Sequence, residues 1–288
     1  MKNIIKKKHT KCCCNNKSCA LNVKISLQGN KSISHFFLYV KIFFDGNQRL
    51  TLKKGGTVMY SLLSRPKEEG YVADSFGAFL VEGARFSSHE EYPIIEKSMI
   101  AQELPVDIMP FNKALTYRGD LSKTFICTFS PDETFERVRR NPKKYLDFFK
   151  RTAGLIGFDF SIHSDMPLIK QKAQIYDNLA LTYFYGNNGV PVIPNVRSGV
   201  DELTPEFLEC IPKNSTIAIG THGFMKEMRE KYEWYCFLDE VINTIHPKNI
   251  VVYGTLSSKI FDDFKKSTNI ICYPSWISDR WRRVKNGD

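Results

Sequence analysis

From about residue 150 onward, short apolar runs alternate with segments of helical periodicity. The apolar runs predict buried strands at residues 190–193, 216–219, 250–253 and 270–272. A further run, Gly154 to Gly157, leads into a polar tip at Asp159. Helical segments are predicted at residues 135–151, 234–245 and near 260–265. A further helix is predicted to begin at a cap, Ser164 or Asp165, with Pro167 in its first turn, and to end near Gly186. This alternation is typical of an α/β fold with an open, mostly parallel sheet flanked by helices.

The first 70 residues follow a different pattern. Residues 1–18 are rich in Lys, Asn and Cys, which predicts a basic, flexible leader. Alternating apolar and polar residues at 21–27 and 36–44 predict strands, and hence a β-rich extension over residues 19–70. The stretch from Pro66 to Gly70 has the composition of a boundary, so the α/β domain is predicted at residues 71–288.

Composition sets limits on the class of protein. Of 288 residues, 42% are apolar and 13% aromatic, which is enough for a buried core and excludes a wholly disordered chain. No apolar run approaches the roughly 20 residues that span a bilayer, and the basic start is not followed by the apolar core of a signal peptide. We therefore expect a cytoplasmic protein with no contact to a membrane.

Charge is distributed unevenly along the chain. Residues 1–70 hold 14 basic and 3 acidic side chains, whereas residues 71–288 hold 27 basic and 28 acidic ones. A basic leader on a nearly neutral body favours a polyanionic partner, and DNA is the partner we expect. A solvated tail that only aids solubility is the alternative.

The cysteines divide in the same way. Four cluster near the start, Cys12, Cys13, Cys14 and Cys19, and four are scattered among apolar neighbours, Cys127, Cys210, Cys236 and Cys272. The scattered cysteines read as buried thiols of a reducing compartment. The cluster, with His9 nearby, lacks two separated C-x-x-C pairs, so free thiols are favoured over a zinc site.

Polar groups follow the predicted strands. In parallel sheets, ligands bind beyond the carboxyl ends of the strands, so these tips should meet at one edge. The tips are residues 157–163, 194–199, 220–223, 254–258 and 273–278. Each alone is equally well explained as a turn, a cap or aromatic packing. Together they bring an acid, two imidazoles, an amide, an arginine and several aromatics to one place, which predicts a site.

The order of these tips resembles the uracil-DNA glycosylase superfamily. That superfamily has a first strand ending in G-Q-D-P-Y-H, and Gly157-Phe158-Asp159 keeps the Gly-x-Asp, with His163 nearby. The family then has an apolar strand ending in Asn, and the stretch from Gly189 to Asn195 is similar in shape.

The carboxyl-terminal third carries the closest likeness to this superfamily. There the family has a helix near a Trp, a strand ending at Gly, a short helix, and a strand ending in H-P-S-P. The segments in the same order here are Trp234 to Leu238, Ile250 to Gly254, and Tyr273-Pro274-Ser275-Trp276. A basic stretch then lies where family members grip DNA, with Arg280, Arg282, Arg283 and Lys285.

The departures from the superfamily are specific. Tyr273 stands in place of the HPSP histidine, an extra strand lies at 216–219, and residues 1–135 have no counterpart. Residues 125–255 also resemble an uncharacterised domain family of phages and mobile elements. Its features appear here as Phe135-Glu136-Arg137-Val138 with Asn141-Pro142, Asp159-Phe160-Ser161 with Asp165-Met166-Pro167, and Ile193-Pro194-Asn195-Val196-Arg197.

The glycosylase resemblance implies roles for individual residues on double-stranded DNA with a flipped base. Asp159 would serve the attacking water, and His222, Tyr273 or His163 would stabilise the departing base. Phe158 or Phe160 would stack on the base, Asn195 would read its edge, and Arg197 would hold a phosphate or polar substituent. Ser275, Arg280, Arg282 and Arg283 would bind DNA. The scheme requires no cofactor, no metal and no obligate protein partner.

Other functions remain open at this stage. A non-catalytic DNA-binding or replication-accessory protein of a mobile element would use the same basic segments. A metal-dependent nuclease is less well supported, because Asp159 and Asp165 lack a Glu-x-Lys partner. The departures from the superfamily motifs argue against uracil as the excised base. The resemblance to a phage domain family points instead to modified bases of phage DNA, such as glucosylated hydroxymethylcytosine.

Overall fold

The structure is a computed structural model that describes residues 21–23, 40–42, 77–163, 165–197, 203–221, 228–254 and 261–279. The chain divides into two compact units, Met1–Gly56 and Thr57–Asp288. In the first unit, strands β1 (Leu21–Val23) and β2 (Val40–Ile42) pair in antiparallel orientation. The predicted leader and most of the predicted β-rich extension lie outside the described residues, and both stay predictions.

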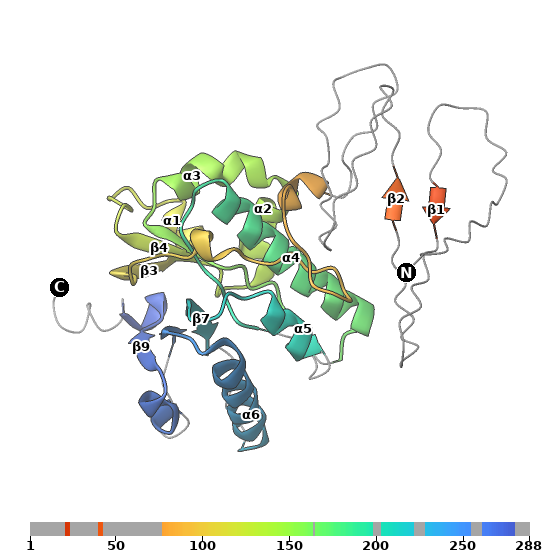
Figure 1. Ribbon diagram of the computed structural model, residues 1–288. Coiled ribbons are helices and arrows are strands. Elements are labelled where there is room, and N and C mark those ends of the chain that lie inside the picture. The colour runs from red at the N-terminus through yellow and green to blue at the C-terminus, as the bar shows by residue number, and fades with distance from the viewer. Residues whose placement is uncertain are drawn as a thin grey trace. The chain divides into compact units, whose positions relative to one another are not determined.

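The second unit is built on parallel strands (Figure 1). They are β3 (Asp107–Pro110), β4 (Thr124–Cys127), β5 (Gly154–Ile156), β6 (Val192–Ile193), β7 (Thr216–Gly220), β8 (Asn249–Tyr253) and β9 (Asn269–Tyr273). Strands β3 to β6 form one sheet and β7 to β9 another, with all neighbours parallel. The predicted α/β fold with a parallel sheet is confirmed.

A parallel bridge between Asn195 and Ala218 joins the two sheets. The Val196 N–H donates to the Ala218 carbonyl at 2.8 Å, and the Ala218 N–H donates to the Pro194 carbonyl at 2.8 Å. The strands therefore follow one another across the molecule in chain order, from β3 to β9, without a reversal of direction.

The helices between the strands are mostly short. They are α1 (Phe111–Ala114), α2 (Glu136–Arg140), α3 (Leu146–Lys150), α4 (Leu168–Asn187), α5 (Thr204–Glu209) and α6 (Met228–Ile245). The single helix predicted at 135–151 is wrong: Pro142, which lacks an N–H, starts a 3-10 turn (Pro142–Tyr145) between α2 and α3. The predicted cap of α4 is also wrong, because Pro167 holds the N-cap position without a side-chain bond.

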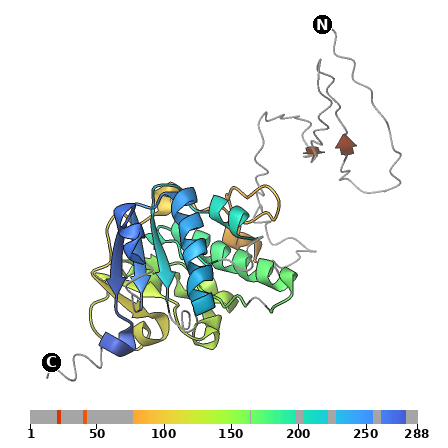
Figure 2. The ribbon, with the colours of Figure 1, turned by 90° about the horizontal axis from the view of Figure 1, so that it is seen from below.

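The strands turn alternate side chains to two cores. One core combines Met109, Ile126, Leu155, Val192 and Ile250 with buried residues of helices α1 to α6. The other core is formed by the opposite strand faces, with Ile108, Phe125, Ile156, Ile193 and Val251. Period-two burial on both faces is what a parallel sheet requires. In Figure 2 the blue strands of the carboxyl-terminal part run side by side, with α6 alongside them.

Two contacts join residues from strands that are distant in the strand order. The ring of Phe129, just after β4, stacks on Tyr253 at the end of β8, with 5.3 Å between centroids. The Tyr273 hydroxyl at the end of β9 donates to the Pro105 carbonyl, just before β3, at 2.6 Å. The first and last strands of the order are thus tied together.

Two of the four scattered cysteines are buried as predicted, Cys127 and Cys210, while Cys236 and Cys272 are exposed. Cys272 lies on β9, the last strand of the order, whose side chains are only partly covered.

Within the described residues, no helix has the length and apolar content that crossing a bilayer requires.

Candidate functional site

The tip that follows β5 is fixed through its backbone. Each of the five consecutive N–H groups from Gly157 to Ser161 donates a hydrogen bond. The acceptors are, in order, Ile193 O (2.8 Å), Thr182 Oγ1 (3.2 Å), Thr128 Oγ1 (2.9 Å), Asn178 Oδ1 (2.8 Å) and both carboxylate oxygens of Asp132 (3.2 Å each). A segment in which every donor is satisfied, here by groups from four different parts of the fold, has little freedom to move.

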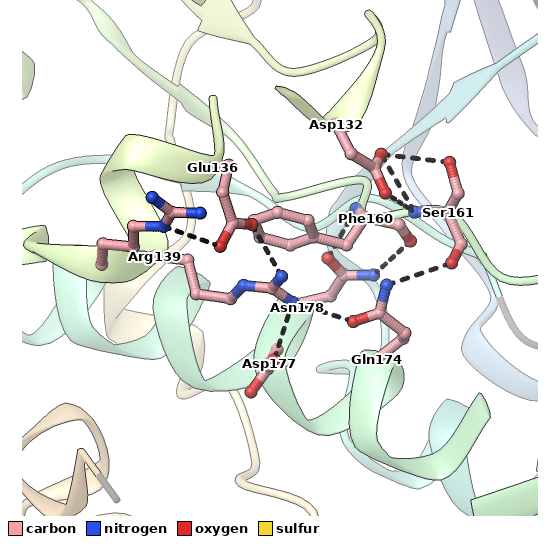
Figure 3. Close-up of polar contacts among 9 residues, drawn as sticks. Asp132, Glu136, Arg139, Phe160, Ser161, Gln174, Asp177 and Asn178 are labelled. Carbon is pink, nitrogen blue, oxygen red and sulfur yellow. Dashed lines mark hydrogen bonds and ion pairs between the residues drawn. The ribbon is translucent and has the colours of Figure 1, made fainter. Parts of the chain in front are cut away.

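Helix α4 supplies a stripe of polar side chains to this tip. Gln174, Asn178 and Thr182 are spaced four residues apart and therefore share one face of the helix. The Asn178 amide makes a pair of bonds with Phe160, accepting from its N–H and donating to its carbonyl at 3.2 Å. Gln174 donates to the Ser161 carbonyl at 3.2 Å. Figure 3 shows both amides pointing from α4 to the tip.

Arg139 of α2 closes the same network from the other side (Figure 3). Its guanidinium lies over the Phe160 ring, with 4.4 Å between Cζ and the centroid. It pairs with Glu136 at 2.6 Å and Asp177 at 3.2 Å, and donates to Gln174 Oε1 at 3.0 Å. The backbone on the carboxyl side of Asp159 is therefore held between two helices.

Asp159, Asn195 and Arg197 meet at the carboxyl end of the sheet. The Asn195 Nδ2 donates to Asp159 Oδ1 at 2.8 Å, and Arg197 Nη1 donates to Asp159 Oδ2 at 3.0 Å. The Asp159 side chain is 11% exposed and that of Arg197 21% exposed, so solvent reaches both. The two tips after β5 and β6 thus bring a carboxylate, an amide and a cation into contact.

Burial raises the pKa of the Asp159 carboxyl above its ordinary value, because a charge is costly where water is scarce. Arg197 and the Asn195 amide oppose this rise by stabilising the carboxylate. Each carboxylate oxygen receives one of these two bonds and has a further lone pair available. Asp159 is therefore placed to accept a proton or orient a water molecule.

The Asn195 side chain has one unused acceptor. Its Nδ2 donates to Asp159 and, at 3.3 Å, to the Phe158 carbonyl, while its Oδ1 is buried without a hydrogen-bond partner among the described residues. Asn195 is 8% exposed and lines a cavity of about 10 Å³ together with Thr182, Pro194 and Arg197. A cavity of this size has room for about one water molecule.

Phe158 and Phe160 do not have the geometry predicted for them. Their rings are 1% and 0% exposed and pack in the core with Phe135, Phe149 and Tyr185. A ring buried on both sides offers no face to a base. In this conformation they position the backbone of Asp159 and cannot stack on a base.

Three further predicted residues lie apart from this cluster. The Tyr273 hydroxyl donates its hydrogen bond to the Pro105 carbonyl, and burial raises the pKa of this hydroxyl. His163 is exposed in a turn with Met166. Ser275 exchanges a hydrogen bond with Ser278 and begins the helical residues 276–279, as a capping serine does.

His222, Arg280, Arg282 and Arg283 lie outside the described residues, as does the cysteine cluster Cys12 to Cys19. Their predicted roles stay predictions. Among the described residues, no group of three His, Cys, Asp or Glu side chains is close enough to hold a metal ion.

Sequence reasoning missed the residues that support Asp159 from behind. Thr128 follows β4, a strand that the apolar pattern did not predict. The stripe on α4 left a signal, since Gln174, Asn178 and Thr182 interrupt the apolar face at helical spacing. Polar residues on a buried helical face indicate hydrogen bonds to something that is not helix.

Comparison with known proteins gives a family and two relatives. Residues 86–274 match the family described as "Domain of unknown function (DUF4417)", and this range includes the tips after β5 and β6. The "Gene 1 protein" of Mycobacterium phage L5 is 26% identical over 128 residues, which cover 44% of this chain and 56% of the phage protein. The "Gene 1 protein" of Mycobacterium phage D29 is 22% identical over 158 residues, covering 55% and 57%.

The chain thus aligns with a little over half the length of these curated relatives. No solved structure matches the chain.

Proposed function

We propose that this chain, which belongs to the family described as a domain of unknown function (DUF4417), is a DNA glycosylase that releases a base and leaves an abasic site. One observation carries the proposal: a carboxylate, an amide and a guanidinium meet at the carboxyl end of a parallel sheet, beside a cavity for one water molecule. In α/β folds this end of the strands is where ligands bind.

In the proposed reaction, a water oxygen forms a bond to the sugar C1′ while the bond from C1′ to the base nitrogen breaks. The electron pair of the broken bond leaves with the base, and the sugar passes through a cation. Asp159 stabilises that cation and takes the proton that the water loses. The fixed backbone of the tip means that the carboxylate does not have to reorganise as charge develops.

Asn195 and Arg197 adjust the properties of this carboxylate. Because its amide nitrogen is engaged by Asp159, Asn195 presents only its buried Oδ1, which is able to accept a hydrogen bond from a water molecule in the cavity. Arg197 favours the ionised form of Asp159 and so opposes the effect of burial on its pKa, and its partly exposed guanidinium is also able to bind a phosphate oxygen. The cavity has room for a water molecule but not for a base, so we place the base on the solvent side of Asp159.

The substrate is proposed to be duplex DNA in which a base is flipped out of the stack. The relatives in two mycobacterial phages make phage DNA a reasonable first substrate to test. Modified bases such as glucosylated hydroxymethylcytosine come first, because the strand tips depart from the uracil motif at Tyr273. His222 is the predicted donor to the departing base, because the Tyr273 hydroxyl donates to the Pro105 carbonyl.

The test is an alkali-cleavage assay on end-labelled DNA carrying unmodified or modified bases. Breaks that appear only after alkali treatment support a glycosylase. Breaks without alkali identify a nuclease, and retarded migration without breaks identifies a DNA-binding protein, so both contradict the proposal. Glu96→Gln is a matched control for Asp159→Asn, because Glu96 also pairs with an arginine, Arg85, at 2.8 Å, but lies in another part of the fold.

A non-catalytic DNA-binding protein is the second candidate. The observation in its favour is that both Asp159 oxygens already receive a hydrogen bond within the protein. In that case Asp159 only holds the tip and Arg197 in place and takes no part in a reaction. Asp159→Asn then changes the affinity for DNA, and neither the wild-type protein nor the variant forms abasic sites.

A further inference from the structure

We propose that Arg139 is a positioning residue for Asp159: it does not touch the reacting atoms but fixes the direction in which the carboxylate points. The inference rests on the proposed function, since it assigns a role within that site. It is carried by the contacts between Arg139, the Phe160 ring and helix α4.

The first step is the connection from Arg139 to Asp159. The guanidinium covers the ring of Phe160, the residue directly after Asp159, at 4.4 Å. That ring is completely buried and lies 4.6 Å from the Phe135 ring, centroid to centroid. With its side chain enclosed by Arg139 and Phe135, Phe160 cannot rotate without moving the backbone of Asp159.

The second step is the connection from Arg139 to the polar stripe. The guanidinium donates to Gln174 Oε1, and this leaves the Gln174 amide nitrogen free to donate to the Ser161 carbonyl. Asp177, one helical turn away from Gln174, binds the same guanidinium. One side chain thus sets the orientation of the groups that hold the backbone two residues beyond Asp159.

The neighbouring Arg140 offers a matched control. Both arginines pair with Glu136, Arg139 at 2.6 Å and Arg140 at 3.4 Å. Arg140 is 78% exposed, whereas Arg139 is 34% exposed and makes the contacts with Phe160 and Gln174. Half-exposed ion pairs contribute little to stability, so neither substitution is expected to unfold the protein.

The experiment compares Arg139→Met, Arg139→Lys and Arg140→Met in the full chain, by base release and by amide hydrogen exchange. For Arg139→Met we expect kcat to fall about 10- to 100-fold with KM unchanged, because a displaced catalytic group costs rate without loss of DNA contacts. Exchange of the N–H groups of Phe158 to Ser161 is expected to accelerate. Arg139→Lys should recover part of kcat, since it keeps the charge near Glu136 and Asp177.

Arg140→Met should leave kcat and exchange as in the wild type. The inference is overturned if Arg139→Met keeps its kcat, if KM changes as much as kcat, or if exchange accelerates equally throughout the fold. If the wild-type protein releases no base, the proposed function fails. Hydrogen exchange at residues 158–161 then still decides whether Arg139 holds this tip.

Discussion

At the scale of single residues, Asp159 is the group on which the proposed chemistry depends. We expect Asp159→Asn to reduce base release on the order of 10²- to 10³-fold, because the sugar cation loses its counter-charge. DNA binding should be largely retained. A residue that only caps a turn tolerates this change, since Asn caps nearly as well as Asp.

The measurement counts abasic sites over time with both proteins and compares their melting temperatures. Glu96→Gln, which removes a charge from another arginine pair, should keep the wild-type rate. An Asn variant that melts normally and releases base at the wild-type rate would show that Asp159 is not the catalytic carboxylate.

The pH dependence of base release follows from the environment of Asp159. Burial raises the pKa of this carboxyl above the ordinary 3.8, partly offset by Arg197 and Asn195. Because the ionised form is the active one, the rate should be constant above this pKa and fall tenfold per pH unit below it. The fall therefore begins at a higher pH than for an exposed aspartate.

Arg197→Met provides the comparison for the pH profile. Without the guanidinium, the carboxylate is less stabilised, so its pKa rises and the acidic limb moves to higher pH. The raised pKa also affects stability. The folded protein binds this proton more tightly than the unfolded chain does, so the contribution of Asp159 to the free energy of unfolding decreases as pH rises through the pKa of the folded state. Single-turnover rates in both proteins test this, and an unmoved limb contradicts it.

At the scale of elements, the contact between the tips after β5 and β6 depends on a glycine. A Cβ at Gly157 would lie 2.8 Å from the Asn195 backbone nitrogen and 3.1 Å from Thr182 Oγ1. This backbone cannot move aside easily, because the Pro194 and Val196 backbones on either side of it are bonded to β7. We expect Gly157→Ala to cost about 1–3 kcal/mol in the free energy of unfolding.

Gly186→Ala on α4 is the control for Gly157→Ala. Its Cβ would lie 2.9 Å from Met99 Sδ and 3.0 Å from Met99 Cβ, so it also crowds a neighbour, but none of its three nearest atoms is a backbone atom, and alanine favours helix over glycine by about 1 kcal/mol. Urea unfolding distinguishes the two variants. Equal midpoints for both would contradict the interpretation that Gly157 is required by close backbone contact.

The sequence pattern predicted the elements whose apolar runs are clean. Strands β7, β8 and β9 appear within one residue of their predicted bounds. Strand β3 was not predicted because it contains a proline and an aspartate, and β4 was missed although its four residues are all buried. The helix predicted at 135–151 was broken by Pro142, whose effect outweighed the apolar periodicity around it.

The candidate site was also predictable only in part. Asp159 follows β5, and Asn195 and Arg197 follow β6. Because β5 and β6 pair in parallel, these residues are expected at the same edge of the sheet, where the strands end. The burial of Phe158 and Phe160 was not predictable, because it depends on contacts with Phe135, Phe149 and Tyr185, which come from other elements of the fold. Side-chain contacts across elements, such as Arg139 on Phe160, leave no periodic signal in a single sequence.

At the scale of the whole molecule, the proposed function predicts that the basic leader adds to DNA affinity while the α/β unit carries the candidate site. Residues 1–18 carry six lysines and no carboxylate. Deleting them should leave the melting temperature of the α/β unit unchanged, weaken DNA affinity and flatten its dependence on salt, because fewer counterions are released. Affinity measured over a series of salt concentrations checks this.

A full-length variant with these six lysines replaced by glutamine separates charge from chain length. It should match the deletion in both affinity and salt slope. A salt slope that is unchanged in either protein would show that the leader does not contact DNA phosphates.

The uninterrupted order of the strands also bears on how the protein is made. Each strand from β4 to β9 joins the strand that comes before it in the chain, through short ladders and the bridge at Asn195. A chain leaving the ribosome amino end first can therefore add every new strand to an edge that already exists, so translation and sheet growth run in the same direction. The bond from Tyr273 to Pro105 spans 168 residues and has to wait until the last strand has been synthesised.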